Sequence, residues 1–196
     1  MRRNNFECLI SDLDVRPLLR SIETHSSLWQ QITARQTVPG TPHVDTQTIF
    51  LRWSAAQTIE AAFNDLDAVD YPALMDLPEA RPLLGESVEA ARAHTLGRAI
   101  IVSLKPGGRI TPHADEGAYA DHYERFHLCL QSDHGNLFHV ADPANPHIYT
   151  TAEMKPGQLW WFNHKRTHWV ENHSNRERIH LIMDMVAPAY RTERGT

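Results

Sequence analysis

Three side chains of metal-ligating type stand out by their spacing. His113 and Asp115 are two residues apart, and His168 follows 55 positions after His113. In an extended segment, residues two apart face the same side, so His113 and Asp115 can converge on one ion. The interval before His168 has room for about four strands with their loops, an even number that returns the chain to the edge it left. We therefore predict that His113, Asp115 and His168 bind one metal ion.

Two imidazoles and one carboxylate leave other coordination positions of the metal open. This donor set is typical of non-haem Fe(II) oxygenases. A 2-oxo acid that chelates the iron and a molecule of dioxygen both need such open positions, whereas closed four-ligand sites are structural. The ligand types therefore favour Fe(II) as the metal, with a 2-oxo acid and O2 as cosubstrates.

Arg178 lies ten residues beyond His168 and begins a segment with period 2, in which Arg178, His180 and Asp184 share one face. A guanidinium that points into a barrel is costly unless a carboxylate pairs with it. Its planar fork suits the distal carboxylate of a dicarboxylic cosubstrate. The alternative is a structural ion pair with Asp184 or Glu177.

An earlier segment, Arg125-Phe126-His127-Leu128, repeats the same pattern of arginine, apolar residue, histidine and leucine. Two predicted strands thus place an arginine and a histidine on an inward face. Arg125 and His127 are candidates for the wall of the same pocket, although an inward histidine is also common as a packed core residue.

Other histidines compete for the metal, since ten of the 13 histidines follow residue 100. His164 lies in a predicted turn and His173 ends a strand, so both are weaker candidates than His168. His43 and Asp45 repeat the two-residue spacing, but no suitable distal histidine and arginine follow them. We interpret that earlier pair as a polar cluster at the start of a strand, and the remaining histidines as surface or packing residues.

The elements that position these side chains change character along the chain. Apolar spacing predicts helices that begin at Asp14–Pro17 and at Ser54, where Gln57 completes a capping-box pattern, and a third helix over Glu86–His94 after a turn-prone stretch at Pro78–Gly85. From about Gly97 the period becomes 2, which predicts an antiparallel sandwich or barrel. The predicted strands are Thr46–Trp53, Ala99–Leu104, Tyr123–Gln131, Asn136–Ala141, His147–Thr151, Gln158–Phe162, His168–Asn172 and Arg178–Val186, with a short strand that leads to His113.

Composition limits the classes of partner. The chain has 196 residues, 41% of them hydrophobic, and a net charge of −5, which argues against nucleic acid or an anionic membrane held by bulk electrostatics. Cys8 and Cys129 are too few for a disulfide scaffold, and no segment has the length of a signal peptide or a membrane span. We expect a cytoplasmic protein.

Five segments together resemble the aspartyl/asparaginyl β-hydroxylase family of Fe(II)- and 2-oxoglutarate-dependent oxygenases, which includes free-proline hydroxylases. They run in order from about Gly97 to Pro188: His-x-Asp at 113–115, Tyr-Glu-Arg-Phe-His-Leu at 123–128, Pro-Gly-x-Leu-Trp-x-Phe at 156–162, Thr-His-Trp-Val-Glu-Asn-His-Ser at 167–174, and Arg-x-His-Leu-x-x-Asp at 178–184. Some members of the family lack the carboxylate ligand, whereas this chain has Asp115. Ser103 is one position out of register with a serine of some members, and no role is assigned to it.

The resemblance implies an α+β protein with a double-stranded β-helix, a cupin-like jelly roll. In it, His113 and His168 ligate iron, Arg178 binds the distal carboxylate of 2-oxoglutarate, and Arg125 and His127 line the cosubstrate pocket. We expect one domain over residues 1–196, with a helix-rich part to about 96 and a metal-binding β core at about 97–188. The expected activity is hydroxylation of an amino-acid residue in a peptide or protein, or of a free amino acid, with succinate and CO2 as coproducts. The alternatives are a cupin-like binding protein without turnover and a zinc-dependent hydrolase or isomerase at the same ligands.

Overall fold

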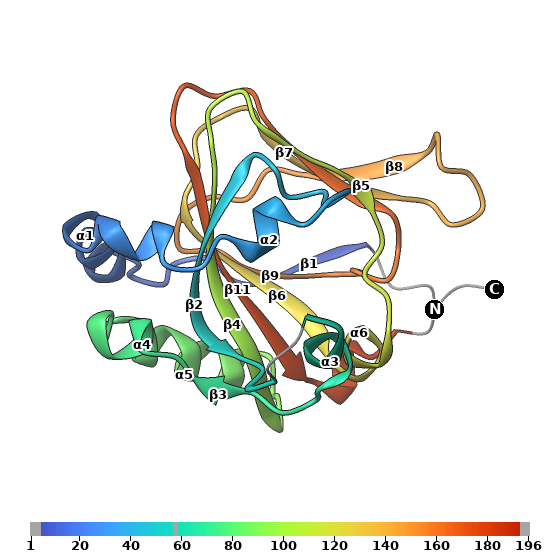
Figure 1. Ribbon diagram of the computed structural model, residues 1–196. Coiled ribbons are helices and arrows are strands. Elements are labelled where there is room, and N and C mark those ends of the chain that lie inside the picture. Colours follow the sequence, from blue (N-terminus) through green and yellow to red (C-terminus); the bar gives the residue numbers. More distant parts are fainter. Residues whose placement is uncertain (1–4, 57–58, 193–196) are drawn as a thin grey trace.

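Two antiparallel sheets face each other in the computed structural model, which describes residues 5–56 and 59–192 (Figure 1). The larger sheet has seven strands in the order β1-β9-β6-β11-β4-β2-β3, and the smaller has four in the order β5-β10-β7-β8. The bounds are β1 Phe6–Ile10, β2 Thr46–Trp53, β3 Val69–Asp70, β4 Thr95–Leu104, β5 Arg109–His113, β6 Glu124–Gln131, β7 Asn136–Ala141, β8 Tyr149–Ala152, β9 Leu159–Phe162, β10 His168–Asn172 and β11 Arg178–Val186. This confirms the antiparallel sandwich predicted from the strand pattern and the jelly roll that the family resemblance implies.

The predicted strands are present, and four of them, β2, β7, β10 and β11, have the expected bounds. β4 begins four residues earlier than expected, at Thr95, because it continues to pair with the end of β11. The sequence pattern missed β1, which pairs with β9, and the two-residue β3, which pairs with β2. Residues from the first part of the chain therefore form three strands of the larger sheet.

Helices cover the outer face of the seven-stranded sheet: α1 (Arg16–Thr24), α4 (Ala73–Asp76) and α5 (Ala80–Ala90) (Figure 1). α1 begins where predicted, with Pro17 in its first turn, and buries Leu18 and Ile22 against the sheet. α5 begins earlier than the predicted Glu86, because Pro82 falls in the first turn, where a proline lacks no needed donor. It ends before His94, since the chain turns at Arg92 with a φ of 48°.

Three short helices lie away from that face: α2 (Ala34–Thr37), α3 (Ile59–Asn64) and α6 (Ala118–His122). α3 falls in the second predicted helix, where Ser54 Oγ accepts a hydrogen bond from the Ala56 N–H. Gln57, the other half of the predicted capping box, lies outside the described residues. α6 lies between β5 and β6, where the sequence pattern predicted no helix or strand. No helix among the described residues is long and apolar enough to cross a membrane.

The alternation of β6 and β11 gives the larger sheet two different faces. Phe126 and Leu128 on β6, with Leu181 on β11, point to the outer face and are fully buried beneath the helices. On the inner face Arg125 of β6 lies opposite Asp184 of β11. Further along the same face the two strands carry His127 and His180. The inner face looks onto the smaller sheet, so polar side chains are enclosed between the two sheets.

Candidate metal centre

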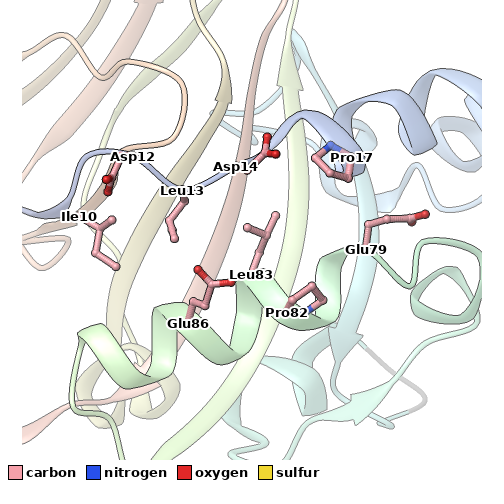
Figure 2. Close-up of a pocket in the computed structure, with 9 residues that line it drawn as sticks. All are labelled: Ile10, Asp12, Leu13, Asp14, Pro17, Glu79, Pro82, Leu83 and Glu86. Carbon is pink, nitrogen blue, oxygen red and sulfur yellow. The ribbon is translucent and has the colours of Figure 1, made fainter.

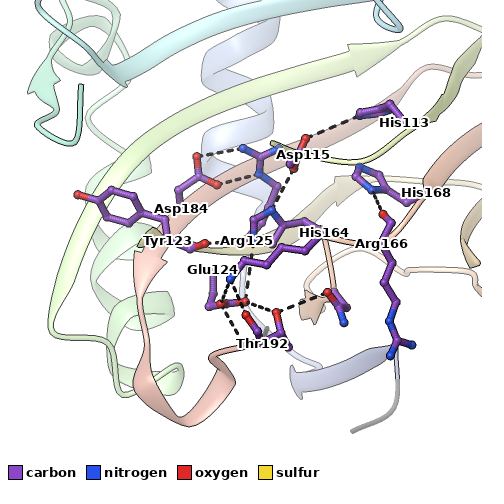
Figure 3. Close-up of polar contacts among 12 residues, drawn as sticks. His113, Asp115, Tyr123, Glu124, Arg125, His164, Arg166, His168, Asp184 and Thr192 are labelled. Carbon is purple, nitrogen blue, oxygen red and sulfur yellow. Dashed lines mark hydrogen bonds and ion pairs between the residues drawn. The ribbon is translucent and has the colours of Figure 1, made fainter. Parts of the chain in front are cut away.

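The three predicted ligands come together at one mouth of the sandwich. β5 ends at His113 and β10 begins at His168, and these two residues are paired across the smaller sheet. Asp115 follows two residues after β5. One ligand atom of each of His113, Asp115 and His168 lies within 4.8 Å of the others (Figure 3). Four strands, β6 to β9, separate β5 from β10, which is the even number that the spacing predicts.

Backbone carbonyls orient both imidazoles. His113 Nδ1 lies 2.8 Å from the Thr111 carbonyl oxygen, and His168 Nδ1 lies 2.9 Å from that of Arg166. A carbonyl accepts but cannot donate, so Nδ1 carries the hydrogen in each ring and Nε2 keeps its lone pair. Burial lowers the pKa of His168 to about 3, and it also lowers the pKa of His113. Both rings are therefore neutral at neutral pH, with the Nε2 lone pair available to a metal ion, the form that metal binding requires.

Asp115 offers one carboxylate oxygen to the centre and uses the other for support. Its Oδ2 accepts hydrogen bonds from Arg125 Nη1 at 2.5 Å and from His164 Nδ1 at 3.2 Å, while its Oδ1 lies 3.9 Å from His113 Nε2. Burial alone would raise the pKa of Asp115, but the charge of Arg125 and the bond from His164 outweigh it and hold the pKa well below its usual range. The carboxylate is thus ionised and oriented.

Arg125 lies beside the predicted ligands and is held by two carboxylates of this chain. Its guanidinium bridges Asp115 and Asp184, with Nε 2.8 Å from Asp184 Oδ1 and Nη2 3.2 Å from Asp184 Oδ2. Arg125 and Asp184 are opposite one another on β6 and β11 (Figure 3). Burial opposes the charged form of Arg125, but the two carboxylates raise its pKa above the ordinary value. The guanidinium is therefore charged and connects the predicted ligand Asp115 to β11, and its place in the wall of a cosubstrate pocket stays a prediction.

His164 is a part of the site that the sequence analysis assigned to surface or packing. Its ring is buried, with Nδ1 facing Asp115 and Nε2 3.1 Å from the Tyr123 carbonyl oxygen. The Asp115 N–H also donates to the His164 carbonyl at 3.0 Å. The next residue, Lys165, forms a buried ion pair with Glu124 at 2.9 Å, which fixes this turn against β6. The position within a polar turn gave no signal of these contacts.

A second group of buried polar atoms lies on the inner face of β6 and β11. Arg178 is 2% exposed, and its Nη2 donates to His180 Nδ1 at 3.1 Å. Both ring nitrogens of His127 and Nε2 of His180 are buried and have no hydrogen-bond partner in the described part of the chain. Burial lowers the pKa of Arg178 to about 10, and among the described residues no carboxylate forms an ion pair with it. The structural pairing of Arg178 with Asp184 is wrong, because Asp184 pairs with Arg125.

Aromatic rings connect this polar group to the predicted ligands. The centre of the Phe138 ring lies 5.7 Å from the Arg178 guanidinium, 5.3 Å from the His127 ring and 6.0 Å from the His168 ring. Phe162 packs against both His127 and His168, at 5.1 Å from each. An apolar wall thus separates two polar ends, one with the His-Asp-His group and one with an unpaired guanidinium.

The earlier pair, His43 and Asp45, does not form a second centre. Asp45 pairs with Lys105 at 2.6 Å and accepts a hydrogen bond from the Arg109 N–H, whereas His43 packs edge-on against His113 with ring centres 5.2 Å apart. The polar cluster that we expected at the start of β2 is therefore present around Asp45, and His43 contributes to the surroundings of the metal centre.

A separate pocket lies between the start of α1 and α5 (Figure 2). Leu13, Pro17 and Leu83 form its apolar lining, and acidic residues such as Asp12 and Glu86 also border it. It lies on the helix-covered side of the larger sheet and includes none of the residues of the His-Asp-His group. It is therefore distinct from the candidate centre.

Among solved structures, the chain is similar to an oxidoreductase of the 2OG-Fe(II) oxygenase family from Burkholderia pseudomallei, with a TM-score of 0.57 and 15% identity over 85% of this chain and 77% of that one. It is also similar to AviO1 from Streptomyces viridochromogenes Tue57, with a TM-score of 0.56 and 14% identity over 96% and 92% of the two chains. A Pseudomonas putida prolyl-4-hydroxylase gives a TM-score of 0.51 and 13% identity over 93% and 92%. At such identities these similarities establish the fold alone.

The comparison with curated proteins gives no match. The model of the aspartyl/asparaginyl beta-hydroxylase family matches residues 41–188, which include every strand from β2 to β11 and all three predicted ligands. The chain therefore belongs to the aspartyl/asparaginyl beta-hydroxylase family, whose type of activity is that of an oxygenase.

Proposed function

We propose that the protein is an Fe(II)- and 2-oxoglutarate-dependent dioxygenase in which His113, Asp115 and His168 bind the iron. The observation that carries this proposal is the convergence of one ligand atom from each of the three residues within 4.8 Å, in an arrangement where backbone carbonyls occupy Nδ1 of both imidazoles. Three donors of these types on one side of an ion match the facial triad of such enzymes and leave positions for other ligands. Structural zinc sites instead use four protein ligands.

Arg178 is our proposed partner for the distal carboxylate of 2-oxoglutarate. A buried guanidinium without a carboxylate is unfavourable in the ligand-free protein, and a dicarboxylic cosubstrate supplies the missing charge. The unpartnered nitrogens of His127 and His180 lie in the same compartment and would provide further hydrogen bonds. Phe138 and Phe162 would contact the carbon chain between the two ends and exclude water from it.

Arg125 and His164 act, in this proposal, as positioning residues for Asp115. Both hold Oδ2, so Oδ1 remains the oxygen that faces the metal. Supporting contacts of this kind fix the orientation of a ligand and its basicity. When bound, iron and 2-oxoglutarate would supply the oxidising chemistry, in which the 2-oxo acid and O2 give succinate and CO2 and one oxygen atom enters a substrate C–H bond.

The proposed substrate is an amino-acid residue in a peptide or protein, or a free amino acid. Membership of the aspartyl/asparaginyl beta-hydroxylase family supports this class of substrate. The similarity to a prolyl-4-hydroxylase agrees with it, although that similarity concerns the fold.

Succinate formation tests the proposal. The protein is purified anaerobically and supplied with Fe(II), 2-oxoglutarate, ascorbate and O2, and succinate is measured by mass spectrometry. We expect slow uncoupled turnover, and a loss of 2-oxoglutarate affinity of about 30-fold or more in Arg178→Met, since a charge-assisted bidentate contact is lost. Arg176→Met removes an exposed arginine two residues away and is the matched control.

The alternatives predict different results. A folded, iron-loaded protein that forms no succinate under any condition would favour a cupin-like binding protein. Hydrolysis or isomerisation with Zn(II), without consumption of O2, would favour the zinc enzyme. Unchanged 2-oxoglutarate affinity in Arg178→Met would remove Arg178 from the cosubstrate site.

A further inference from the structure

Arg35, on the short helix α2, has a guanidinium that is only partly satisfied by the chain. Its Nη2 donates to His43 Nε2 at 3.1 Å, while its Nη1 is buried and has no partner among the residues that the structure describes. Within residues 5–56 and 59–192, no carboxylate forms an ion pair with Arg35. Burial lowers its pKa to about 10, so the side chain still carries its charge near neutral pH. An enclosed cation therefore has an N–H group available for an anion.

His43 adds a second donor beside it. Arginine has no acceptor, so His43 Nε2 must accept the bond from Arg35 and the remaining hydrogen of the neutral ring is on Nδ1. His43 Nδ1 is also buried, and no described residue offers it a hydrogen-bond partner. The His43 ring packs against that of His113, with centres 5.2 Å apart, which places both donors next to the predicted metal ligands. The charge of Arg35 also interacts with those of Asp115 and Arg125.

The charges around the centre set Arg35 apart from the other two arginines. Arg125 is matched by the carboxylates of Asp115 and Asp184. The charges of a divalent metal and of dianionic 2-oxoglutarate would cancel. The positive charge of Arg178 would then offset the extra negative charge of the group formed by Arg125 and its two carboxylates. Among the described residues, neither a carboxylate of this chain nor the proposed cosubstrate pairs with Arg35. Arg98 is a further buried arginine without a carboxylate among these residues, but its guanidinium donates to the Ala62 and Asp65 carbonyls and lies over the rings of Trp53 and Tyr119.

We propose that Arg35 and His43 bind a carboxylate group of the substrate beside the metal centre, so that the substrate class is a carboxylate-bearing amino acid or peptide. This inference rests on the proposed oxygenase function. The substrate carboxylate would accept from Arg35 Nη1 and supply a negative charge beside this cation, and His43 Nδ1 is a further donor for the same substrate. Arg35 precedes the segment that matches the family model, so it is a feature of this chain outside the matched region.

The carboxylate could belong to the main chain of a free amino acid or to an acidic side chain, and a set of probes separates the two. The set contains free L-amino acids, their C-terminal amides, and N-acetyl aspartyl and glutamyl amides, which carry only a side-chain carboxylate. Binding is measured by saturation-transfer NMR on the Zn(II)-loaded protein saturated with 2-oxoglutarate, in which no oxidation takes place. Product is then sought with Fe(II) and O2 as an added mass of one oxygen atom.

We expect at least one carboxylate to bind and its matched amide to bind at least tenfold more weakly. If only the free amino acids bind, the group is the α-carboxylate; if the N-acetyl amides bind, it is an acidic side chain. Arg35→Gln should weaken the best carboxylate at least tenfold without changing 2-oxoglutarate affinity, and Arg35→Lys should fall between. Arg20→Gln, which alters an exposed arginine on α1, is the control.

His43→Phe is a second variant that keeps the aromatic contact with His113 and removes the Nδ1 donor, and it should also weaken carboxylate binding. Equal binding of acid and amide, no binding of any carboxylate in the set, or unchanged affinity in both Arg35→Gln and His43→Phe overturns the inference. These outcomes leave the oxygenase function standing if succinate still forms. Carboxylate binding without succinate formation would count against the oxygenase and retain the subsite.

Discussion

Alternate residues of β6 and β11 point to opposite faces of the larger sheet, and the two faces differ in how well their side chains are satisfied by the chain itself. On the outer face of β6 and β11, side chains such as Leu128 and Leu181 are fully buried and need nothing from outside the chain. On the inner face Arg178, His127 and His180 are equally buried, yet their polar atoms lack partners among the described residues or have only each other.

The comparison shows where stability and function divide. Burial of a leucine contributes about 1.5–3 kcal/mol to folding, whereas a buried polar group without a partner costs about 1–3 kcal/mol. The outer face therefore stabilises the sheet, and the inner face reduces that stability until a ligand completes its hydrogen bonds. Unsatisfied groups at one face of an otherwise well-packed sheet are typical of a binding site.

The largest expected effect is the loss of Fe(II) affinity when a predicted ligand is removed. His168→Ala should weaken Fe(II) affinity roughly a thousandfold, or about 4 kcal/mol, because loss of a ligand exceeds the 10- to 100-fold effect of altering a supporting contact. Competition with a chromophoric chelator under anaerobic conditions measures this affinity. His173→Ala removes an exposed histidine just beyond β10 and should leave it unchanged. Equal effects of the two variants would exclude His168 as a ligand.

Truncation of a side chain on the outer face should lower stability and leave metal affinity unchanged. Leu128→Ala should lower the free energy of unfolding by about 3 kcal/mol, since it opens a cavity in a fully buried layer. The folded fraction should still bind one Fe(II) with unchanged affinity. Urea denaturation and the same chelator competition measure the two quantities, and a loss of metal affinity without a loss of stability would break the division between the faces.

Sequence reasoning succeeded where the signal is local or follows from strand parity. The alternation of β6, β7, β10 and β11 is visible in each segment alone, and the convergence of His113 with His168 follows from the number of strands between them. It failed where tertiary pairing decides. β1 becomes a strand because it lies beside β9, more than 140 residues away, and its own residues carry no alternating pattern.

The site shows the same limit. The Arg-x-His spacing placed Arg125 on the inner face correctly, but it could not show that Asp115 and Asp184 reach its guanidinium. His164 lies in a turn whose polar residues predict exposure, and its contact with Asp115 spans 49 positions of the chain. Arg35 has no motif at all, because its importance comes from the charge balance of the folded compartment.

A smaller effect, of opposite sign, is expected for Arg178→Met. The variant removes an unpaired buried charge, so the ligand-free protein should gain about 1 kcal/mol of unfolding free energy. Saturating 2-oxoglutarate should stabilise the wild type in urea denaturation and not the variant, because ligand binding to the native state adds stability. Destabilisation of the ligand-free variant would instead give Arg178 a structural role.

Stability of the ligand-free protein should also depend on pH through the buried histidines of the inner face. Burial, followed by the charge of Arg178, holds the pKa of His127 and of His180 well below the ordinary value. In the unfolded chain a histidine titrates near 6.5, so below about pH 6.5 the unfolded state binds protons that the native state does not. Stability of the ligand-free protein should therefore fall as pH falls below that value, and each buried histidine contributes up to about 1.4 kcal/mol per pH unit.

His180→Gln should remove one of these contributions. Urea denaturation between pH 7.5 and pH 5.5, at roughly half-unit steps across the range where the unfolded imidazole titrates, would give a slope of stability against pH that is shallower than in the wild type. His147→Gln removes an exposed imidazole in the loop before β8, which keeps its hydration on folding, and should not change the slope. Parallel slopes for wild type and His180→Gln would mean that His180 gains a proton within the folded protein, and that the inner face is wetter than its burial indicates.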